Sequence, residues 1–304
     1  MAALTGLERV SGAEARRPRA WWRGLVFLTA GIYFLVPLGT SFWYTVHTPG
    51  AGVSFSAYGE LLTADGFVRS LSLSLGLALA TIVLVLLLAL PAMLAVRLFA
   101  PRLGPVMEVL CTLPLVVPPI TFVAGIGTSL RDGTEVLAPT PFWATLIAVQ
   151  DPAFPVVLVL AYVVLVLPFV YRSLDAGLRT MDVRTLVEAA RSLGASWPYV
   201  LARVIVPNLR SALASASFLT LALVLGEYTV ASLLGYEPFA VWIVTVSGSK
   251  GQLSVAVSIL SLLLIWVLLL AVSTVFGRSR KSREPRSSRT TSRKSRTSRK
   301  EKGK

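Results

Sequence analysis

The chain has 304 residues, of which 55% are hydrophobic and 14% are charged, and its formal net charge at pH 7 is +14. A soluble domain of this length needs more charged residues to cover its surface, and the charges here are gathered in a few short blocks. The composition therefore argues against a soluble protein and indicates an all-α polytopic membrane protein. One cysteine, Cys111, and one histidine, His47, offer no internal disulfide and no cluster of metal ligands.

Residues 1–23 are predicted to be a cytosolic tail, because arginines precede an apolar run that can span and no convincing cleavage site follows it. A transmembrane domain is predicted over 24–277. It contains six apolar runs that reach roughly 20 residues, the length that spans a bilayer. Each must be helical, because backbone groups in hydrocarbon are satisfied only within their own segment. The six predicted spans are 24–46, 70–95, 106–128, 154–171, 210–235 and 253–277. The run 140–149 is too short to span and is interpreted as interfacial or re-entrant.

The lysines and arginines lie almost entirely on one side of these spans. The two tails, the loop 96–105 and the loop 172–209 with Arg210 at its edge hold 26 of the 29 basic residues. The other side holds Arg69, Arg131 and Lys250. Because cytoplasmic loops carry the excess of basic residues, both termini are predicted to be cytoplasmic.

Prolines interrupt the third predicted span in the run LPLVVPPITFVAGIG, residues 113–127. Pro114, Pro118 and Pro119 each remove a backbone donor, so that the helix is expected to bend or break there. Broken helices at membrane depth often line a substrate cavity. A kinked helix with a purely structural role is an equally good interpretation.

Glu227 lies within the fifth predicted span. Ionisable groups inside spans are costly and usually face a cavity or a partner. Two interpretations remain open: a structural hydrogen bond near the outer interface, or a carboxylate that lines the path of a solute. In the second, four polar residues of the same span form a stripe with it, namely Ser217, Thr220, Tyr228 and Thr229. Glu108, close to Arg102, is interpreted as an interfacial ion-pair residue.

The loop before the fifth span contains EAARSLGASWPYVLARVIVP, residues 188–207, a mixed polar and apolar stretch between two long apolar runs. Asp182 is placed to cap a helix that follows it. Gly194 stands where that helix is expected to end, because glycine readily adopts the left-handed conformation found after helix C-termini. The apolar residues at helical spacing on this predicted helix are Leu186, Ala189, Ala190 and Leu193.

A second helix is predicted after this turn. Ser196 is expected to cap it, Pro198 is tolerated in its first turn, and Pro207 ends the segment. The exposed pair of helices, with small residues near the turn, has a shape that inserts into a groove of another protein. The residues alone leave this docking role and an ordinary connector between spans equally open.

The spacing of the same residues resembles a family motif. Glu188-Ala189-Ala190 is followed after three residues by Gly194, and after nine more by Val204-Ile205-Val206-Pro207. This resembles the EAA loop, EAA-x3-G-x9-I-x-L-P, of the permease subunits of binding-protein-dependent ABC importers. Val204 and Val206 replace the usual isoleucine and leucine. The resemblance in span layout covers about residues 65–277 and points to the type I permease fold.

The resemblance implies a role for the loop 178–209 as a coupling helix in a cleft of a cytosolic ATPase subunit. The positions that match the docking motif are Glu188, Ala189, Ala190, Gly194 and Pro207. The resemblance also implies two copies of that ATPase, which bind ATP with Mg, a second permease that is identical or paralogous, and an extracytoplasmic solute-binding protein. The expected location is a bacterial plasma membrane.

The chain has no G-x-x-x-x-G-K-[ST] phosphate loop, so ATP hydrolysis is expected on the separate ATPase subunit. The chain itself is therefore predicted not to be an enzyme and to bind no cofactor or metal. An autonomous secondary transporter is a remote alternative. That class normally carries several intramembrane ionisable residues or inverted repeats, whereas only Glu227 lies well within a predicted span.

The prediction of the transported solute rests on weaker resemblances. The proline-rich run is similar to the matching span of permeases for polyamines, molybdate, sulfate, iron and thiamine. The runs GEYTVASLLG and FAVWIVTVSGSKGQLSVAVSILSLLL, the latter at 239–264, look most like the spermidine/putrescine branch. The candidate residues of the translocation path are Glu227, Tyr228, Thr229, Thr220, Ser217, Pro118 and Pro119, and a carboxylate among them would suit an organic cation. Iron, thiamine, phosphonate or another small solute is the alternative.

The tail 278–304 is basic, of low complexity and without hydrophobic residues. It cannot bury a core and is predicted to be disordered. Its charge alone is compatible with nucleic acid. Because it has no interleaved aromatic residues, we expect it to rest on anionic lipid headgroups instead and expect no nucleic-acid partner.

Overall fold

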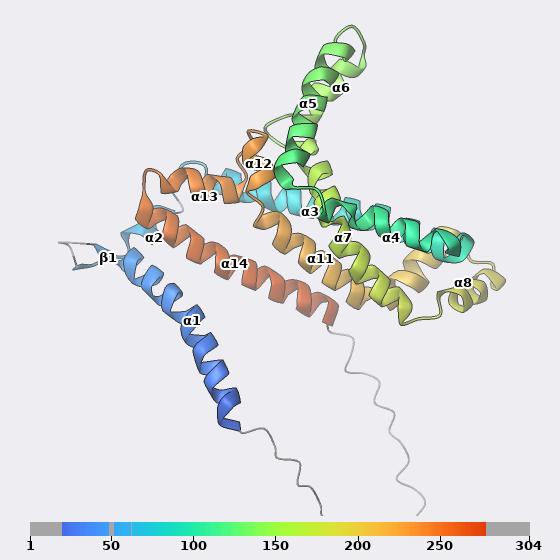
Figure 1. Cartoon of the computed structure of the whole chain (residues 1–304), viewed down its shortest axis with the longest axis horizontal. Helices are drawn as coiled ribbons and strands as arrows, with labels where there is room; N and C mark the ends of the chain where they lie inside the picture. The colour runs from blue at the N-terminus through green and yellow to red at the C-terminus, as the bar shows by residue number, and fades with distance from the viewer. Residues whose placement is uncertain (1–19, 49–51, 62, 278–304) are drawn as a thin grey trace, which may run out of the picture. The chain divides into compact units, whose positions relative to one another are not determined.

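The computed structural model describes residues 20–48, 52–61 and 63–277, almost all of them helical (Figure 1). The part of the predicted N-terminal tail before residue 20, and the predicted tail 278–304, lie outside the described residues. Contacts within the chain define two units. Among the described residues, the first comprises those from 20 to 67 together with 243–262, and the second comprises 68–242 together with 263–277.

The first unit begins with an apolar helix that is followed by a small β-hairpin. Its elements are α1 (Ala20–Val46), β1 (His47–Thr48), β2 (Gly52–Val53) and α2 (Ser56–Leu61), and His47 pairs with Val53 in the antiparallel hairpin. The hydroxyls of Thr45 and Tyr58 lie 2.9 Å apart and join α1 to α2. The side-chain amide of Gln252 donates to the carbonyls of Tyr44 and His47.

The second unit holds most of the remaining helices. In chain order they are α3 (Phe67–Phe99), η1 (Pro101–Leu103), α4 (Gly104–Thr112), η2 (Leu113–Leu115), α5 (Pro119–Leu137), α6 (Phe142–Val149), α7 (Val156–Arg179), α8 (Val183–Ser192), α9 (Trp197–Tyr199), η3 (Val200–Ile205), α10 (Val206–Asn208), α11 (Arg210–Leu225) and α12 (Thr229–Leu233). The last two helices, α13 (Phe239–Ser247) and α14 (Gly251–Gly277), each contribute residues to both units.

Helices α7 and α11 pack along each other and form the centre of the second unit. Six α7 residues four apart are buried and make one continuous stripe, because residues at i and i+4 share a helix face: Leu158, Tyr162, Val166, Val170, Leu174 and Leu178. Gly177 permits the close approach of the two helices. A Cβ atom there would overlap the side chain of Ala212 and press on Leu209.

The fourth predicted span ends at residue 171, but α7 continues for two more turns to Arg179. The extension keeps an apolar inner face while its outer face becomes charged. Asp175 accepts from Arg97 of α3 at 2.5 Å and from Arg179 at 2.7 Å, and its side chain is 19% exposed. The pair with Arg97 joins the C-terminal ends of α3 and α7, and the pair with Arg179 lies within α7. A span predicted from hydropathy ends where charged residues begin, because hydropathy counts each charge as unfavourable and takes no account of ion pairs between them.

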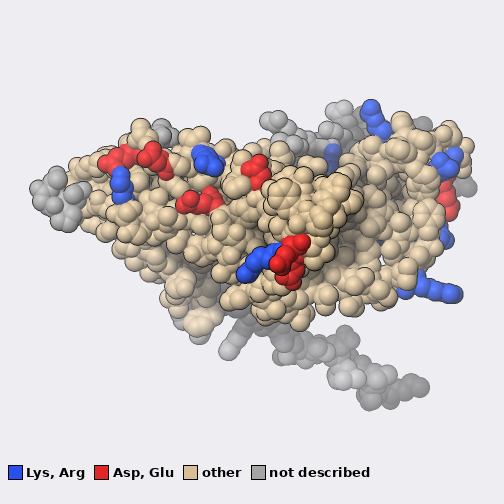
Figure 2. Space-filling model, turned by 90° about the horizontal axis from the view of Figure 1, so that it is seen from above, with Lys and Arg blue, Asp and Glu red and all other residues tan. Residues whose placement is uncertain are grey.

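Four described helices are long and apolar enough to cross a membrane, at Gly24–Val46, Phe67–Phe99, Val156–Arg179 and Gly251–Ala271. Two bent pairs raise the number of candidate spans to six if each pair counts as one. One face of the molecule carries only scattered charged side chains, separated by broad uncharged areas (Figure 2). Such a surface suits a chain that lies largely in lipid.

The two bent pairs correct the predicted third and fifth spans. The helices before and after residues 116–118 differ in direction by 94°, and α5 runs on to residue 137 rather than ending at 128. The expected break at the prolines is confirmed. The fifth span is not one helix over 210–235. It ends at Leu225, and α12 begins at Thr229. The run 140–149 forms the short helix α6.

Candidate functional site

The segment from Asp182 to Leu209, here called the α8 segment, begins with the predicted helix cap. The Asp182 carboxylate accepts the backbone N–H of Thr185 at 3.2 Å and its hydroxyl at 2.6 Å. These hydrogen bonds favour the charged carboxylate and hold the pKa of Asp182 below its ordinary value. The cap fixes where α8 starts and therefore the register of every residue on it.

Replacing Asp182 with alanine is expected to fray the first turn of α8. The Thr185 amide loses its acceptor, so its hydrogen exchange rises, and mass spectrometry of the exchanged peptide measures the change. Asp182→Asn, which also caps, serves as the matched control. Because the pKa of Asp182 is lowered on folding, the cap is fully present above the ordinary aspartate pKa. It is lost only as the pH falls through the lower folded value. Unchanged exchange in the alanine variant contradicts the cap.

Gly194 ends α8 in the predicted conformation. Its φ is +82°, in the left-handed region that favours glycine. The N–H of Gly194 donates to Arg191 O at 2.9 Å, and the N–H of Ala195 donates to Ala190 O at 3.1 Å. This pair of hydrogen bonds is the Schellman pattern, which satisfies carbonyls left without partners at a helix end. The turn reverses the chain within two residues.

The α8 helix turns one face inward and leaves the other exposed. Val183 and Val187 are buried, and Ala190 is half-buried. Glu188, Ala189 and Gly194 are exposed. Leu193, at the end of the helix, is 89% exposed. Of the apolar residues noted at helical spacing, Leu186 and Ala190 are half-buried and Ala189 and Leu193 are exposed, while Val183 and Val187 occupy the inward positions.

The Arg191 side chain contacts the residues that follow the turn at Gly194. Its Nη1 donates to the carbonyl oxygen of Ala195 at 3.0 Å, and its guanidinium lies 5.5 Å from the ring centroid of Trp197. Ser196 precedes the next helix as predicted, but its side chain makes no capping hydrogen bond, which corrects that detail. Pro198 sits in the first turn of α9, where the missing N–H has no consequence.

The return to the membrane domain is a continuous but irregular helix. The π-helical stretch η3 follows α9, and Pro207 lies within the last turn, α10, before the chain bends by 81° into α11. Val200, Ile205 and Leu209 are buried. The α8 segment is thus anchored at both ends and exposes the motif residues between them.

A cavity of about 290 Å³ lies where the break before α5 and the break after α11 face α7. Its lining comes from the proline-rich break, from α7 and from the break after α11: Pro114, Leu115, Val117, Pro119, Tyr162, Leu165, Val166, Phe169, Leu223, Val224, Glu227, Thr229 and Val230. Among the described residues that line it, Glu227 is the charged one. We call this space the Glu227 cavity.

Glu227 lies in the break between α11 and α12, not inside a continuous helix as predicted. One carboxylate oxygen accepts the N–H of Val230 at 2.7 Å, and the other accepts the N–H of Ala231 at 3.2 Å. The carboxylate therefore caps the N-terminus of α12 while it borders the cavity. The structural hydrogen bond that the sequence left open is present, and the carboxylate also borders a cavity, whereas its place in the path of a solute stays a prediction.

The other predicted path residues do not all lie at the Glu227 cavity. Thr229 and Pro119 line the Glu227 cavity with Glu227, whereas Pro118 is the residue just before α5 and lies outside the lining. Ser217 and Thr220 are buried on α11, away from the cavity lining. Tyr228 is 43% exposed. The predicted stripe is therefore not a single line of side chains.

Sequence analysis missed Tyr162, which lies in the middle of α7 and is 1% exposed. Its hydroxyl interacts electrostatically with the Glu227 carboxylate and forms no hydrogen bond of ordinary geometry within the described residues. A tyrosine inside an apolar run was the available signal, because a buried hydroxyl normally requires a partner.

Glu108 forms none of the ion pairs recorded among the described residues, so its predicted pairing with Arg102 is wrong. Instead it lines a cavity of about 420 Å³ together with Arg97, Asp175 and Arg179. Arg102 lies in the helical turn η1, before α4 begins at Gly104, whereas Glu108 lies within α4. Closeness in sequence therefore did not bring the two side chains together.

Comparison with known proteins identifies the class. A family model described as the binding-protein-dependent transport system inner membrane component matches residues 103–283, more than half of the chain. The chain belongs to this family. The crystal structure of a bacterial ABC transporter involved in the import of the acidic polysaccharide alginate has the same fold. The TM-score is 0.62 and the identity 15%, over 86% of this chain and 97% of that chain. No curated protein matches the sequence.

The chain is thus the membrane permease component of an ABC importer, and ATP hydrolysis resides in a separate subunit. The sequence predicted a permease subunit of an ABC importer and ATP hydrolysis on a separate subunit, and both predictions are confirmed. Family membership also implies an ATPase partner and a substrate-binding protein.

Proposed function

We propose that the chain forms one half of the translocation path for a small cationic solute, with a polyamine such as spermidine or putrescine as the preferred candidate. The observation that carries this proposal is the Glu227 cavity. It brings the Glu227 carboxylate and the buried Tyr162 hydroxyl, which interacts with it, to the place where the breaks before α5 and after α11 face α7. A carboxylate in a mostly apolar cavity favours a cation. Iron, thiamine, phosphonate or another small solute remains the alternative.

The α8 segment couples this path to ATP hydrolysis in our proposal. The exposed Glu188, Ala189, Gly194 and Leu193 form a surface for a cleft of the ATPase subunit, and Ala190 and Pro207 fix its shape. The support is geometric: an anchored helix that ends in a tight turn and exposes a large leucine to water is suited to a protein partner.

The proposed arrangement has six spans, with both bent pairs counted, and both termini in the cytoplasm of a bacterium. The placement of basic residues supports this orientation. Two ATPase subunits, which bind ATP and Mg, and a second permease chain, identical or paralogous, complete the importer. An autonomous secondary transporter is the weaker candidate, because the exposed α8 segment has no role in it.

Co-purification tests the assembly. The tagged chain is extracted gently from its native membrane, and the chains that accompany it are identified by mass spectrometry. We expect an ATPase, a permease chain and a solute-binding protein, on which a panel of cationic and neutral ligands then defines the solute. Recovery of the chain alone, under conditions that keep a control importer intact, overturns the proposed assembly. Binding of neutral solutes only overturns the proposed cation.

A further inference from the structure

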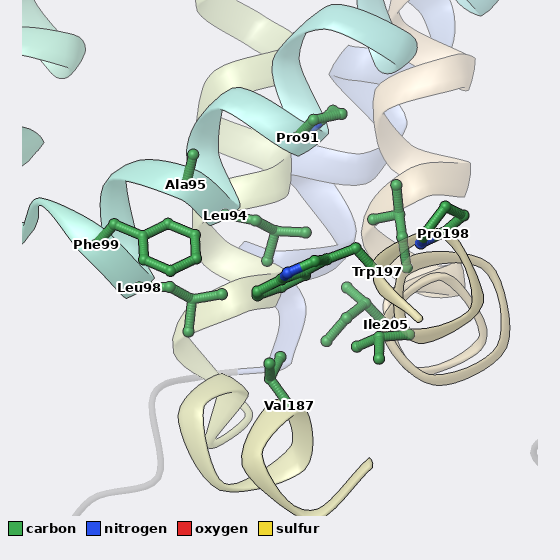
Figure 3. Close-up of a pocket in the computed structure, with 11 residues that line it drawn as sticks. Pro91, Leu94, Ala95, Leu98, Phe99, Val187, Trp197, Pro198 and Ile205 are labelled. Atoms are coloured by element: carbon green, nitrogen blue, oxygen red, sulfur yellow. The ribbon is translucent and has the colours of Figure 1, made fainter. Parts of the chain in front are cut away.

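A further cavity lies beside the α8 segment and has no role in the proposed function. Its volume is about 390 Å³, and it is bounded by the last turns of α3 and by the α8 segment. Pro91, Leu94 and Leu98 of α3 face Val187, Trp197 and Ile205 across it. Figure 3 shows the Trp197 ring projecting from the α8 segment toward Leu94 and Leu98. We call this space the α3–α8 cavity.

The lining makes water a poor occupant. Every described residue that lines the α3–α8 cavity is apolar apart from the indole N–H of Trp197. The cavity opens at the surface, since Ala95, Phe99 and Trp197 are exposed, but an ordered water needs two to four polar partners and finds here only the indole N–H. Left empty, its wall atoms lose their dispersion contacts. An apolar molecule is therefore the occupant that satisfies this surface.

The surroundings point to a lipid as the source of that molecule. Helix α3 is a candidate membrane span, and the cavity lies at its C-terminal end, beside Phe99, which is 70% exposed. Trp197 is 43% exposed, and the Arg191 guanidinium lies over its ring. A tryptophan and a basic residue at the end of a span are typical of the membrane interface, where acyl chains meet phosphate headgroups.

We propose that the α3–α8 cavity binds one acyl chain of a phospholipid, whose phosphate faces Arg191. The hydrogen bond from Arg191 to Ala195 orients the guanidinium, which has five N–H donors in all. The acyl chain fills the space between Leu94, Leu98 and Trp197. The bound lipid then forms part of the support of the α8 segment, so that the segment rests on lipid as well as on protein.

Quenching of Trp197 fluorescence tests the proposal. The full-length chain, with its co-purifying partners, is reconstituted in vesicles of phosphatidylethanolamine and phosphatidylglycerol with brominated acyl chains. The chain has seven tryptophans, so the Trp197 signal is taken as the difference from Trp197→Phe. Ala95→Leu places a larger side chain in the cavity from α3, where leucine is a good helix former. Ala92→Leu makes the same change on the exposed surface of α3 outside the cavity lining.

We expect strong quenching of Trp197 in the parent chain and in Ala92→Leu, and weak quenching in Ala95→Leu. Displacing about two methylenes of acyl chain corresponds to roughly tenfold weaker lipid retention, which native mass spectrometry also measures. Equal quenching in all three overturns the proposal, because Trp197 then meets only bulk lipid. A photo-crosslinker at Ala95 that captures the ATPase subunit instead of lipid also overturns it, without affecting the proposed importer.

Discussion

Gly194→Val is expected to lower ATP-dependent uptake by at least roughly tenfold while the chain still inserts into the membrane. The φ of +82° costs an ordinary L-residue about 1–2 kcal/mol, and a β-branched residue more. Because 1.4 kcal/mol is a factor of ten, the turn is then rarely in the conformation presented to the ATPase. Uptake by the reconstituted complex, with the amount of inserted chain measured in parallel, checks the prediction.

The matched variant Gly194→Asn separates two reasons for this glycine. A Cβ atom at Gly194 meets nothing within 4 Å in the chain itself, so the cost of substitution here is one of backbone conformation. Asparagine tolerates the left-handed conformation and should keep most of the activity if the turn alone matters. If asparagine fails as completely as valine, close approach of the partner is the reason. Normal transport by Gly194→Val removes this glycine from the docking role.

Glu227→Gln is expected to lower uptake of a cationic solute by roughly tenfold or more. The variant replaces a charge-assisted contact, typically worth about 1.5–3 kcal/mol, by a neutral one. It also leaves one oxygen where two now accept the N–H groups of Val230 and Ala231. Loss of one capping bond should lower the free energy of unfolding by about 1 kcal/mol. Uptake kinetics and thermal unfolding of the same preparation measure the two effects.

Tyr162→Phe serves as the companion variant, since it removes a hydroxyl that forms no well-shaped hydrogen bond and changes the cavity little. Replacing an unsatisfied buried polar group with an apolar one is close to neutral for stability. Lower uptake by Tyr162→Phe without a lower free energy of unfolding would therefore indicate that the Tyr162 hydroxyl contacts the solute. Unchanged uptake kinetics in Glu227→Gln, by contrast, would leave Glu227 with only its capping role.

The local structure of the α8 segment could be predicted from its residues because short-range chemistry sets it. Asp182 caps whichever helix follows it, and Gly194 provides the left-handed turn with little help from the rest of the chain. Ser196 is the exception. Its position before a helix was predicted correctly, but a local pattern does not establish which hydrogen bonds a side chain will form.

Of the two breaks that border the Glu227 cavity, the one before α5 could be predicted from the sequence and the one after α11 could not. Pro118 and Pro119 lack backbone donors, so a break near them follows from covalent chemistry. The break at Gly226 to Tyr228 has no proline, and the hydropathy of 210–235 predicted one uninterrupted span there. The Glu227 carboxylate caps α12 there through hydrogen bonds to residues three and four positions later, a local contact that hydropathy does not record.

What the sequence by itself determined was the class of protein: apolar runs long enough to span, basic residues on one side of them, and the spacing from Glu188 to Pro207. Each of these depends on residues close together in the chain or on composition. Only the tertiary structure brought Pro119, Tyr162 and Glu227 around one cavity and Leu94 opposite Trp197 around another. These residues lie far apart in sequence, and side-chain packing between helices, which no local pattern records, decides which of them meet.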